Sequence, residues 1–155
     1  MEEEYYIDFD GVIMNTQDKI DEFFWFFNYD CTDPYWNELL ANIDWNWLLE
    51  QCNEINNSIE KLKELLEQGK KAYILSRVFS QEDADAKEAY LRRRGVNIKV
   101  IPVFGRVPKS SIIKPEPYRL LIDDSIDNIN DWEQNGGKAL YVPKNTCDIK
   151  FLIKK

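Results

Sequence analysis

The sequence predicts an α/β fold in which a parallel sheet carries helices on both faces. From about residue 70 onward, short apolar runs of strand character alternate with segments of helical character, the pattern typical of parallel sheets. The chain has 155 residues, of which 44% are hydrophobic and 31% are charged. This length and composition suit one globular domain with a single core.

The first half of the chain predicts one strand followed by several helices. Residues 5–9 have strand character, and residues 15–52 are rich in aromatic side chains, including every tryptophan except Trp132. We interpret this aromatic segment as two or three short helices, broken near Asp33-Pro34. Four apolar residues that share one helical face predict a further helix: Ile55, Ile59, Leu62 and Leu66. Gly69 should stop this helix.

The second half predicts four more strands, with two helices that have clear start and stop signals. The strands are "KAYILS", "NIKVIPVF", "YRLLIDD" and "KALYVP". Ser80 is placed to cap a helix that runs through Arg94, and Gly95 follows as its terminator. A second helix should run from Ser125 to Asn135. In parallel sheets the ligand binds at the carboxyl ends of the strands, so the functional residues are expected there.

Composition excludes several classes of function. The formal net charge is −8, which argues against a nucleic-acid polymer as the main partner, because such binding depends on Lys and Arg. Histidine is absent, so Ser-His-Asp hydrolysis and His-ligated zinc are excluded. The three cysteines lack CxxC spacing and are expected to be inert in a reducing cytoplasm: Cys31, Cys52 and Cys147. The acidic N-terminus does not resemble a signal peptide, and no apolar run approaches the roughly 20 residues of a membrane span.

Polar side chains gather where the central strands end. Carboxylates follow the first strand and end the fourth, and a serine and an arginine end the second, while a loop between the third and fourth strands supplies basic residues. These residues are Asp8, Asp10, Ser76, Arg77, Arg106, Lys109, Lys114, Asp123 and Asp124. If the strands are neighbours, four carboxylates, a hydroxyl and a lysine converge on one pocket.

So many carboxylates cannot all remain ionised in one pocket without a cation. An all-oxygen ligand set without His or Cys selects a hard ion, and an open site completed by water and phosphate suits Mg²⁺. One aspartate is then placed to act as a nucleophile, and another to give a proton to a leaving alcohol. The sequence therefore predicts a magnesium and phosphate site.

Four segments in order resemble the motifs of the haloacid dehalogenase superfamily of phosphotransferases. They are "DFDGV" after a strand, a strand that ends in serine, a downstream lysine, and "LLIDD", and together they span Tyr5 to about Val142. The resemblance implies a Rossmann-like core with a small helical cap inserted after the first strand. We expect the core in residues 1–14 and 70–155, and the cap in residues 15–69.

The resemblance also implies a role for each residue. Asp8 is the expected nucleophile, and Asp10 the general acid/base, whose backbone carbonyl also touches the metal. Ser76 and Lys109 are expected to bind the phosphoryl group, with Arg77 a further candidate. Lys109 is preferred to Lys114, because Lys114 precedes a proline and is therefore biased toward extended structure. Metal ligands are expected among Asp8, Asp10, Asp123 and Asp124, with Asp124 facing the metal and Asp123 supporting it.

The tail resembles a narrower group within the superfamily. "LLIDDSIDNINDWEQNGGKALYV" is similar to the end of small bacterial and phage proteins grouped with the 5′(3′)-deoxyribonucleotidases. Asn128, Trp132, Gly136 and Gly137 stand at the matching places. The start of the chain departs from that group, because "IMNT" follows "DGV" at a place where those proteins commonly have an acidic or aromatic run. A nucleoside monophosphate is therefore the favoured substrate, and a sugar phosphate or another small metabolite is the alternative.

Simpler readings of these residues remain open. The Asp8 and Asp10 pair could be a turn or a calcium loop, and Ser76 an ordinary turn serine. Arg77 is as well explained by a surface ion pair, and Asp127 by stabilisation of a helix N-terminus. Most aromatic residues of the segment 15–52 are expected to pack in that segment's own core. At least one is expected to face the pocket, and the candidates are Trp25, Trp36, Trp45 and Trp47.

The sequence thus predicts a cytoplasmic, Mg²⁺-dependent phosphatase that acts through an aspartyl-phosphate. Its expected partner is a small phosphorylated metabolite, with no nucleic-acid polymer and no membrane, and its oligomeric state is open. A rival from another class is a binding or regulatory protein that keeps the fold without turnover.

Overall fold

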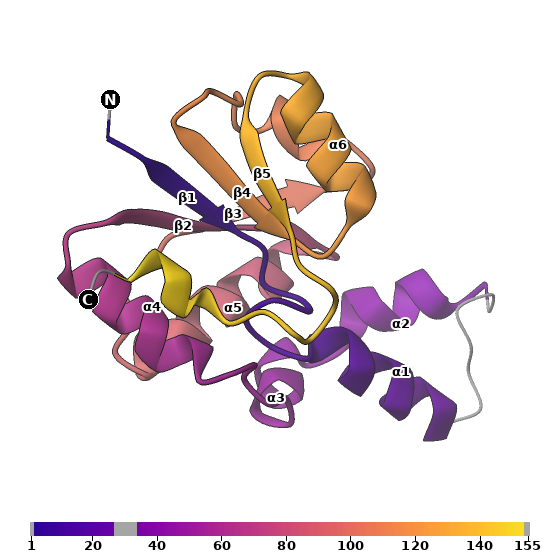
Figure 1. Ribbon diagram of the computed structural model, residues 1–155. Helices are drawn as coiled ribbons and strands as arrows, with labels where there is room; N and C mark the ends of the chain where they lie inside the picture. The colour runs from indigo at the N-terminus through magenta and orange to yellow at the C-terminus, as the bar shows by residue number, and fades with distance from the viewer. Residues whose placement is uncertain (1, 27–33, 154–155) are drawn as a thin grey trace.

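Within the residues that the computed structural model describes, 2–26 and 34–153, the strands form one five-stranded sheet (Figure 1). All the pairings are parallel, and the strand order is β3-β2-β1-β4-β5. This confirms the predicted fold class. The strands are β1 Glu4–Ile7, β2 Lys71–Val78, β3 Val100–Phe104, β4 Arg119–Asp123 and β5 Lys138–Tyr141.

The helices follow the predicted order along the chain. Three of them lie in the aromatic segment, one precedes β2, and two lie in the second half. They are α1 Thr16–Phe26, α2 Trp36–Asn42, α3 Trp45–Glu50, α4 Ser58–Glu67, α5 Gln81–Arg93 and α6 Ile126–Gln134, with short 3₁₀ helices η1 Lys109–Ser111 and η2 Ile149–Leu152. Asp33, at the predicted break in the aromatic segment, lies outside the described residues.

The two predicted helix starts in the second half are confirmed by their caps. The Ser80 hydroxyl accepts a hydrogen bond from the backbone N–H of Asp83, and the Ser125 hydroxyl accepts one from that of Asn128. One predicted start is wrong: Ile55 shares the apolar stripe and is buried, but α4 begins only at Ser58. Asn56 and Asn57 adopt left-handed backbone conformations, with φ of 51° and 53°, which a helix cannot include.

Helices cover both faces of the sheet. In Figure 1, α6 lies on one face and α4 and α5 lie on the other. Under α6, an apolar cluster joins sheet residues to the helix, with Trp132 fully buried against Tyr6. The larger cluster on the opposite face includes Ile7, Ile74 and Ile122 from the sheet and the apolar side of α4. The sheet is therefore a central layer between two apolar layers.

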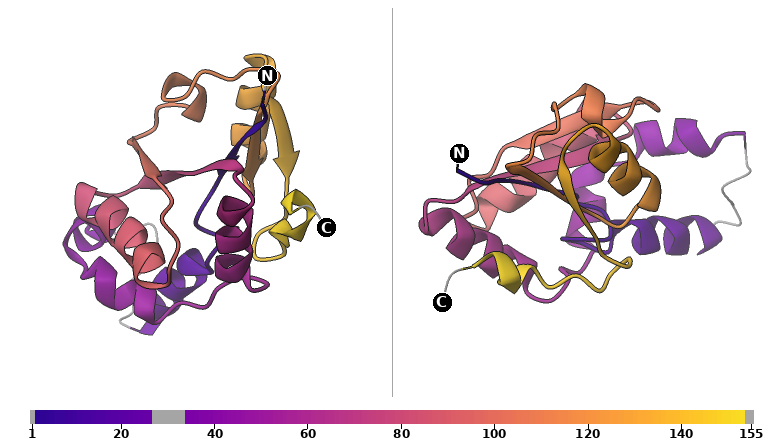
Figure 2. Two further views of the ribbon diagram at one scale, coloured as in Figure 1. Left: turned by 90° about the vertical axis from the view of Figure 1, so that its left-hand side faces the viewer. Right: turned by 45° about the horizontal axis from the view of Figure 1, so that its top comes forward.

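The insertion after β1 extends beyond the carboxyl ends of the strands. Helices α1 and α2 project away from the sheet in Figure 1, and α3 contacts both α1 and α5. By contrast, α4 contacts β2 and the C-terminal η2, beside which it lies in both views of Figure 2. The division into a core and a cap stays a prediction, and α4 is the part of residues 15–69 that packs on the sheet.

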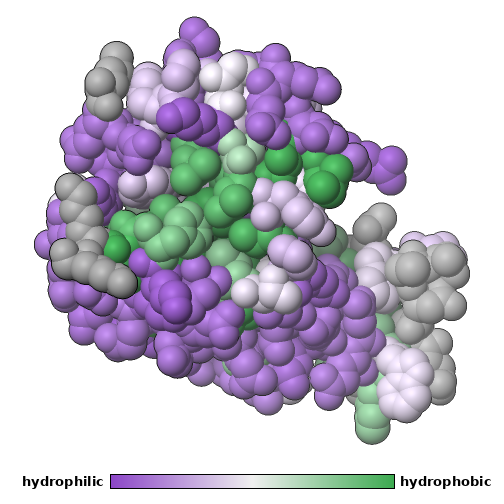
Figure 3. Space-filling model, viewed as in Figure 1, coloured by the Kyte–Doolittle hydropathy of each residue, from purple (hydrophilic) through white to green (hydrophobic). Residues whose placement is uncertain are grey.

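The chain's surface is mixed, and its described cysteines are buried free thiols. Figure 3 shows apolar side chains gathered over the middle of one face, around β5 and η2, where Leu140 and Phe151 are exposed.

Burial raises the pKa of Cys52 to about 12 and that of Cys147 to about 11, whereas Cys31 lies outside the described residues. Over the described parts of the chain, no helix is both long and apolar enough to cross a membrane.

Candidate active site

Asp8 and the Asp123-Asp124 pair lie side by side because β1 and β4 are parallel neighbours. Ile7 pairs with Ile122, so the residues that follow leave the sheet at the same edge. Carboxylate oxygens of Asp8, Asp123 and Asp124 all lie within 4.8 Å of one another. Asp8 and Asp123 are buried, and Asp124 is partly exposed. Two strand ends more than a hundred residues apart in the sequence therefore build one carboxylate cluster.

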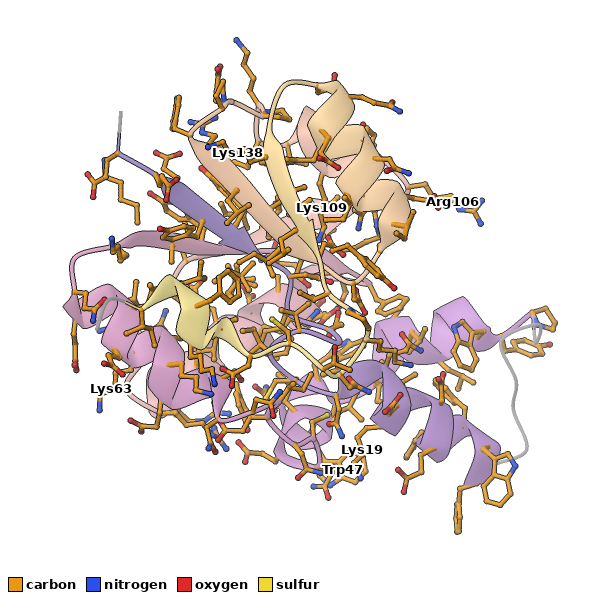
Figure 4. The ribbon with its side chains drawn as sticks, viewed as in Figure 1. Lys19, Trp47, Lys63, Arg106, Lys109 and Lys138 are labelled. Carbon is orange, nitrogen blue, oxygen red and sulfur yellow. The ribbon has the colours of Figure 1, made fainter. Side chains whose placement is uncertain are left out.

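Lys109 places an ammonium group inside this cluster. It begins η1, its side chain is only 1% exposed, and its Nζ lies 2.7 Å from Asp123 Oδ2 and 3.3 Å from Asp8 Oδ1. Burial by itself lowers the pKa of Lys109, but the two carboxylates raise it above its ordinary value. In Figure 4, Lys109 lies inside the molecule while Arg106 points outward. The side chain of Lys114 is 82% exposed and pairs with Glu116.

The charges of the cluster do not balance. Burial raises the pKa of Asp8 well above its usual range, and the Lys109 ammonium opposes that rise while the carboxylates of Asp123, Asp10 and Asp124 add to it. One ammonium cannot neutralise all these carboxylates, so a further cation would be favourable. The donors of the cluster are all oxygens, the set that Mg²⁺ prefers. The residues present therefore fit the metal that the sequence predicts.

The two carboxylates at the end of β4 have different surroundings. Asp123 is fully buried and accepts hydrogen bonds from Lys109, from the backbone N–H of Ser125 and from the side-chain amide of Asn128. Asp124 is partly exposed and lines the cavity. An oxygen already committed to several donors is a poor metal ligand, so this arrangement favours Asp124 as the ligand and Asp123 as its support.

Gly11 allows the turn after β1 to close onto Asp124. Its φ is +81°, a conformation that side chains disfavour. A Cβ at this position would lie 2.3 Å from Asp124 Oδ2 and 3.3 Å from Lys144 Cγ. The Gly11 carbonyl also accepts a hydrogen bond from the backbone N–H of Asn145. A bare backbone is therefore required where this turn meets the proposed metal ligand.

Asp10 is separated from the cluster and is held by another set of residues. Its Oδ1 accepts a hydrogen bond from the hydroxyl of Thr16, and its Oδ2 lies 3.0 Å from the Nζ of Lys87 on α5. Lys87 also contacts Asp83, at 3.2 Å, and the hydroxyl of Ser76, at 3.1 Å. Lys87 and Asp83 are completely buried. The acid pair of "DFDGV" is thus divided between two environments, each with its own lysine.

Sequence reasoning missed Lys87 and Asp83. Their spacing of four residues on a predicted helix looks like an ordinary surface ion pair. The available signal was that Lys87 shares a helical face with Ala84 and Leu91, at i−3 and i+4, which are both buried. A lysine on the apolar side of a helix next to the sheet needs a buried partner, and Asp83 is that partner, while the partly exposed Asp10 is a second one.

The structure brings the two predicted phosphate ligands of β2 to different places. Arg77 lines the cavity, and its Nη1 donates hydrogen bonds to the backbone carbonyls of Gly105 and Val107. Ser76 is fully buried; its hydroxyl accepts a hydrogen bond from Lys87, and it does not appear in the described lining of the cavity. The Ser76 hydroxyl is therefore linked to Asp10 through Lys87.

The cavity at this edge of the sheet is small and polar. Its volume is 180 Å³, and ten described residues line it: Asp8, Asp10, Gln17, Arg77, Lys109, Asp123, Asp124, Ser125, Asn128 and Lys144. No aromatic residue of the described chain is among them, although at least one was expected. Trp25 and Trp47 line a different groove, between α1 and α3, and Trp47 lies far from Lys109 in Figure 4. Trp45 is buried and stacks on Phe79, whereas Trp36 packs against Phe24.

Comparisons with known proteins bear on the fold. No protein-family model matches the chain, and no curated protein shows a significant match. Among solved structures, a hydrolase from Pseudomonas syringae aligns with a TM-score of 0.58 and 13% sequence identity over 98% of this chain and 89% of that one. A HAD-superfamily hydrolase from Ehrlichia chaffeensis aligns with a TM-score of 0.55 and 15% identity, over 97% and 93% of the two chains. The chain therefore has the haloacid dehalogenase-like fold that its four motifs predict, and neither of these similarities singles out the nucleotidase group.

Proposed function

We propose that the protein is a Mg²⁺-dependent phosphomonoester hydrolase in which Asp8 is the nucleophile. One observation carries the proposal: the Asp8 carboxylate lines an open cavity beside Asp123, Asp124 and the Lys109 ammonium. A nucleophile, an oxygen-only metal site and a fixed cation are the parts that phosphoryl transfer requires. The shared fold with two proteins described as hydrolases supports the same reaction class.

In the first step, an Asp8 oxygen attacks phosphorus and the bond from phosphorus to the leaving oxygen breaks. Asp10, in its protonated form, gives its proton to that oxygen, so that the alcohol departs and an aspartyl-phosphate remains on Asp8. Lys109 lies within 3.3 Å of Asp8, so its charge would act on the phosphoryl oxygens as they gain negative charge. Arg77 lines the same cavity and would add a second positive charge.

In the second step, Asp10 takes a proton from water, and the water oxygen attacks the phosphorus of the aspartyl-phosphate. Phosphate leaves and the Asp8 carboxylate is restored. A Mg²⁺ ion held by Asp8, Asp124 and the backbone carbonyl of Asp10 would neutralise carboxylate and phosphoryl charge when bound. Ser76 stays a proposed phosphate ligand, and to bind a phosphoryl oxygen its hydroxyl would have to turn its proton away from the Arg77 carbonyl, to which it donates.

The proposed substrate is a small phosphomonoester, with a nucleoside monophosphate as the first candidate. Pockets that enclose small-molecule ligands measure about 300–1,000 Å³, so a cavity of 180 Å³ would take the phosphoryl end and leave the rest outside. The tail resemblance supports a nucleotide, but Asn128 binds Asp123, and Trp132 lies in the core. A sugar phosphate or similar polar metabolite is the second candidate, because every described residue that lines the cavity has a polar or charged side chain.

The test is release of inorganic phosphate from a panel of nucleoside and sugar monophosphates, with Mg²⁺ and with a chelator. We expect Mg²⁺-dependent release that Asp8→Asn abolishes and that Asp85→Asn, a change at an exposed carboxylate of α5, leaves intact. No release from any member of the panel would refute the enzyme and favour the binding-protein alternative. Release that survives Asp8→Asn would refute the mechanism, and a preference for sugar phosphates would overturn only the nucleotide assignment.

A further inference from the structure

The structure holds a second buried lysine next to the proposed acid/base, and no step of the proposed reaction uses it. We propose that Lys87 is a positioning residue that fixes the Asp10 carboxylate for its two proton transfers. This inference rests on the proposed function, because it concerns how Asp10 is presented to the leaving oxygen and to water.

The Lys87 ammonium contacts three polar groups, two of them through hydrogen bonds. An ammonium has three donors, and the Lys87 Nζ lies 3.0 Å from Asp10 Oδ2, 3.1 Å from Ser76 Oγ and 3.2 Å from Asp83 Oδ1. The contact with Asp83 is an ion pair without hydrogen-bond geometry. Asp83 is itself anchored, because its Oδ2 accepts a hydrogen bond from the backbone N–H of Phe79. The ammonium therefore has a fixed position, set by β2 and by its own helix.

Each carboxylate oxygen of Asp10 has its own partner. Thr16 at the start of α1 donates to Oδ1, and Lys87 on α5 contacts Oδ2. The Asp10 side chain keeps 29% of its surface exposed and lines the cavity. A proton donor or acceptor must be held close to its productive geometry, and misplacement by about 1 Å can cost about 100-fold in rate. Lys87 and Thr16 together provide such a restraint.

Fold stability does not by itself account for a lysine at this position. The Lys87 side chain is 1% exposed, and that of Asp83 is also 1% exposed. Desolvation makes buried ion pairs of this kind weak contributors to stability, and apolar residues of similar volume often serve as well. The neighbours of Lys87 on its own helix, Ala84 and Leu91, are apolar and buried. Among the contacts of Lys87, Asp10 is the one that reaches the cavity.

A double-mutant cycle tests the proposal. Lys87→Met, Asp10→Asn and the combined variant are compared with the intact protein, with a nucleoside 5′-monophosphate as the substrate because its alcohol leaving group needs the proton that Asp10 would supply. General acid/base groups contribute about 100- to 10,000-fold in rate. We expect Lys87→Met to lower kcat by about 10- to 100-fold with little change in KM. In the Asp10→Asn background, the same change should alter kcat by less than about 3-fold.

Controls separate positioning from general damage. Lys114→Met removes a lysine whose side chain is 82% exposed, and it should leave kcat unchanged. If Lys87→Met fails to fold, as judged by circular dichroism, Lys87→Met combined with Asp83→Asn removes both buried charges and should fold while showing the same loss of kcat.

Each outcome decides the proposal. Equal losses of kcat from Lys87→Met in the two backgrounds, an increase in KM alone, or a folded Lys87 variant with normal kcat would overturn it while leaving the proposed function in place. An intact protein that releases no phosphate from any substrate would overturn the proposed function, and this inference with it.

Discussion

Replacing Gly11 with alanine tests whether the turn after β1 is shaped around a metal ligand. The change has two effects on the structure. A side chain at a φ of +81° costs about 1–2 kcal/mol. The new Cβ would also lie 2.3 Å from Asp124 Oδ2, so the carboxylate must retreat by about 1 Å to reach an ordinary contact distance.

A shift of that size exceeds what a metal site tolerates, because metal–ligand distances hold within about 0.2 Å. We therefore expect Gly11→Ala to weaken Mg²⁺ binding by at least about tenfold, a loss of about 1.4 kcal/mol. Ligand binding stabilises the fold by mass action. For a chain of this length 1 kcal/mol corresponds to about 2–4 °C in Tm. The Mg²⁺-induced rise in Tm should consequently shrink by about 3–6 °C, measured at one saturating Mg²⁺ concentration.

Gly69→Ala is the matched control. Gly69 has a φ of +77°, close to that of Gly11, but a Cβ there meets nothing within 4 Å. Without metal, Gly11→Ala should lose at least as much stability as Gly69→Ala, because it adds the contact with Asp124 to a similar backbone strain. Only Gly11→Ala should lose the response to Mg²⁺. Equal Mg²⁺-induced shifts in the two variants would show that Asp124 does not hold the ion, and the argument from the Gly11 turn would be wrong.

Three further predictions concern the core and the charges. Gly137→Ala should lower the free energy of unfolding, measured in urea, by about 1–3 kcal/mol, because its Cβ would lie 2.3 Å from Trp132 Nε1. Gly136→Ala is the control, because a Cβ there meets open space and adds only backbone strain. Equal losses of stability in the two variants would contradict the packing argument. Lys109→Met should abolish phosphate release and cost about 3–5 kcal/mol, since it leaves Asp8 and a second buried carboxylate unpaired; normal turnover in this variant would refute its role. Burial raises the pKa of Asp8 in the folded protein above its value in the unfolded chain. The proton bound to Asp8 should therefore stabilise the fold fully below the unfolded pKa, and this stabilisation should be lost as pH rises through the folded pKa. The affinity for Mg²⁺ should rise over the same pH range, because the ion binds the carboxylate. Titrations of Tm against pH with and without Mg²⁺ measure both trends, and an unchanged pH profile in Asp8→Asn would contradict them.

The sequence predicted the fold because its local signals agree with its tertiary structure. Strands in a parallel sheet are buried on both sides and therefore appear as short apolar runs, and Ser80 and Ser125 mark helix starts by capping chemistry that needs no tertiary information. The same signals placed Asp8 and Asp123 at one edge of the sheet. Strand order was not needed for that step, since the carboxyl ends of all parallel strands lie at one edge.

The sequence could not predict which polar residue faces which other. Ser76 was expected to end its strand, but β2 continues to Val78. The Ser76 hydroxyl binds Lys87 and is not in the described lining of the cavity, and only the packing of α5 against the sheet decides that. The aromatic segment was equally ambiguous, because a tryptophan in a helical segment can face a core, a groove or a site. Trp45 is buried against Phe79 and Trp47 lies in a separate groove, outcomes that depend on how three short helices pack.

The spacing of Asp8 and Asp10 by two residues has a physical explanation in their lysines. Each carboxylate contacts a different buried ammonium, Asp8 that of Lys109 and Asp10 that of Lys87, and each ammonium also contacts a second buried carboxylate. Two neighbouring carboxylates in one environment would share a proton and lose distinct roles. Lys109 opposes the rise that burial causes in the pKa of Asp8, and the proposed metal beside it would oppose that rise further. Asp8 would then serve as the ionised nucleophile, and the proposed reaction assigns the proton exchange to Asp10. The different surroundings of the two aspartates of "DFDGV", on which their proposed roles depend, are thus set by residues that lie outside the motif, on η1 and α5.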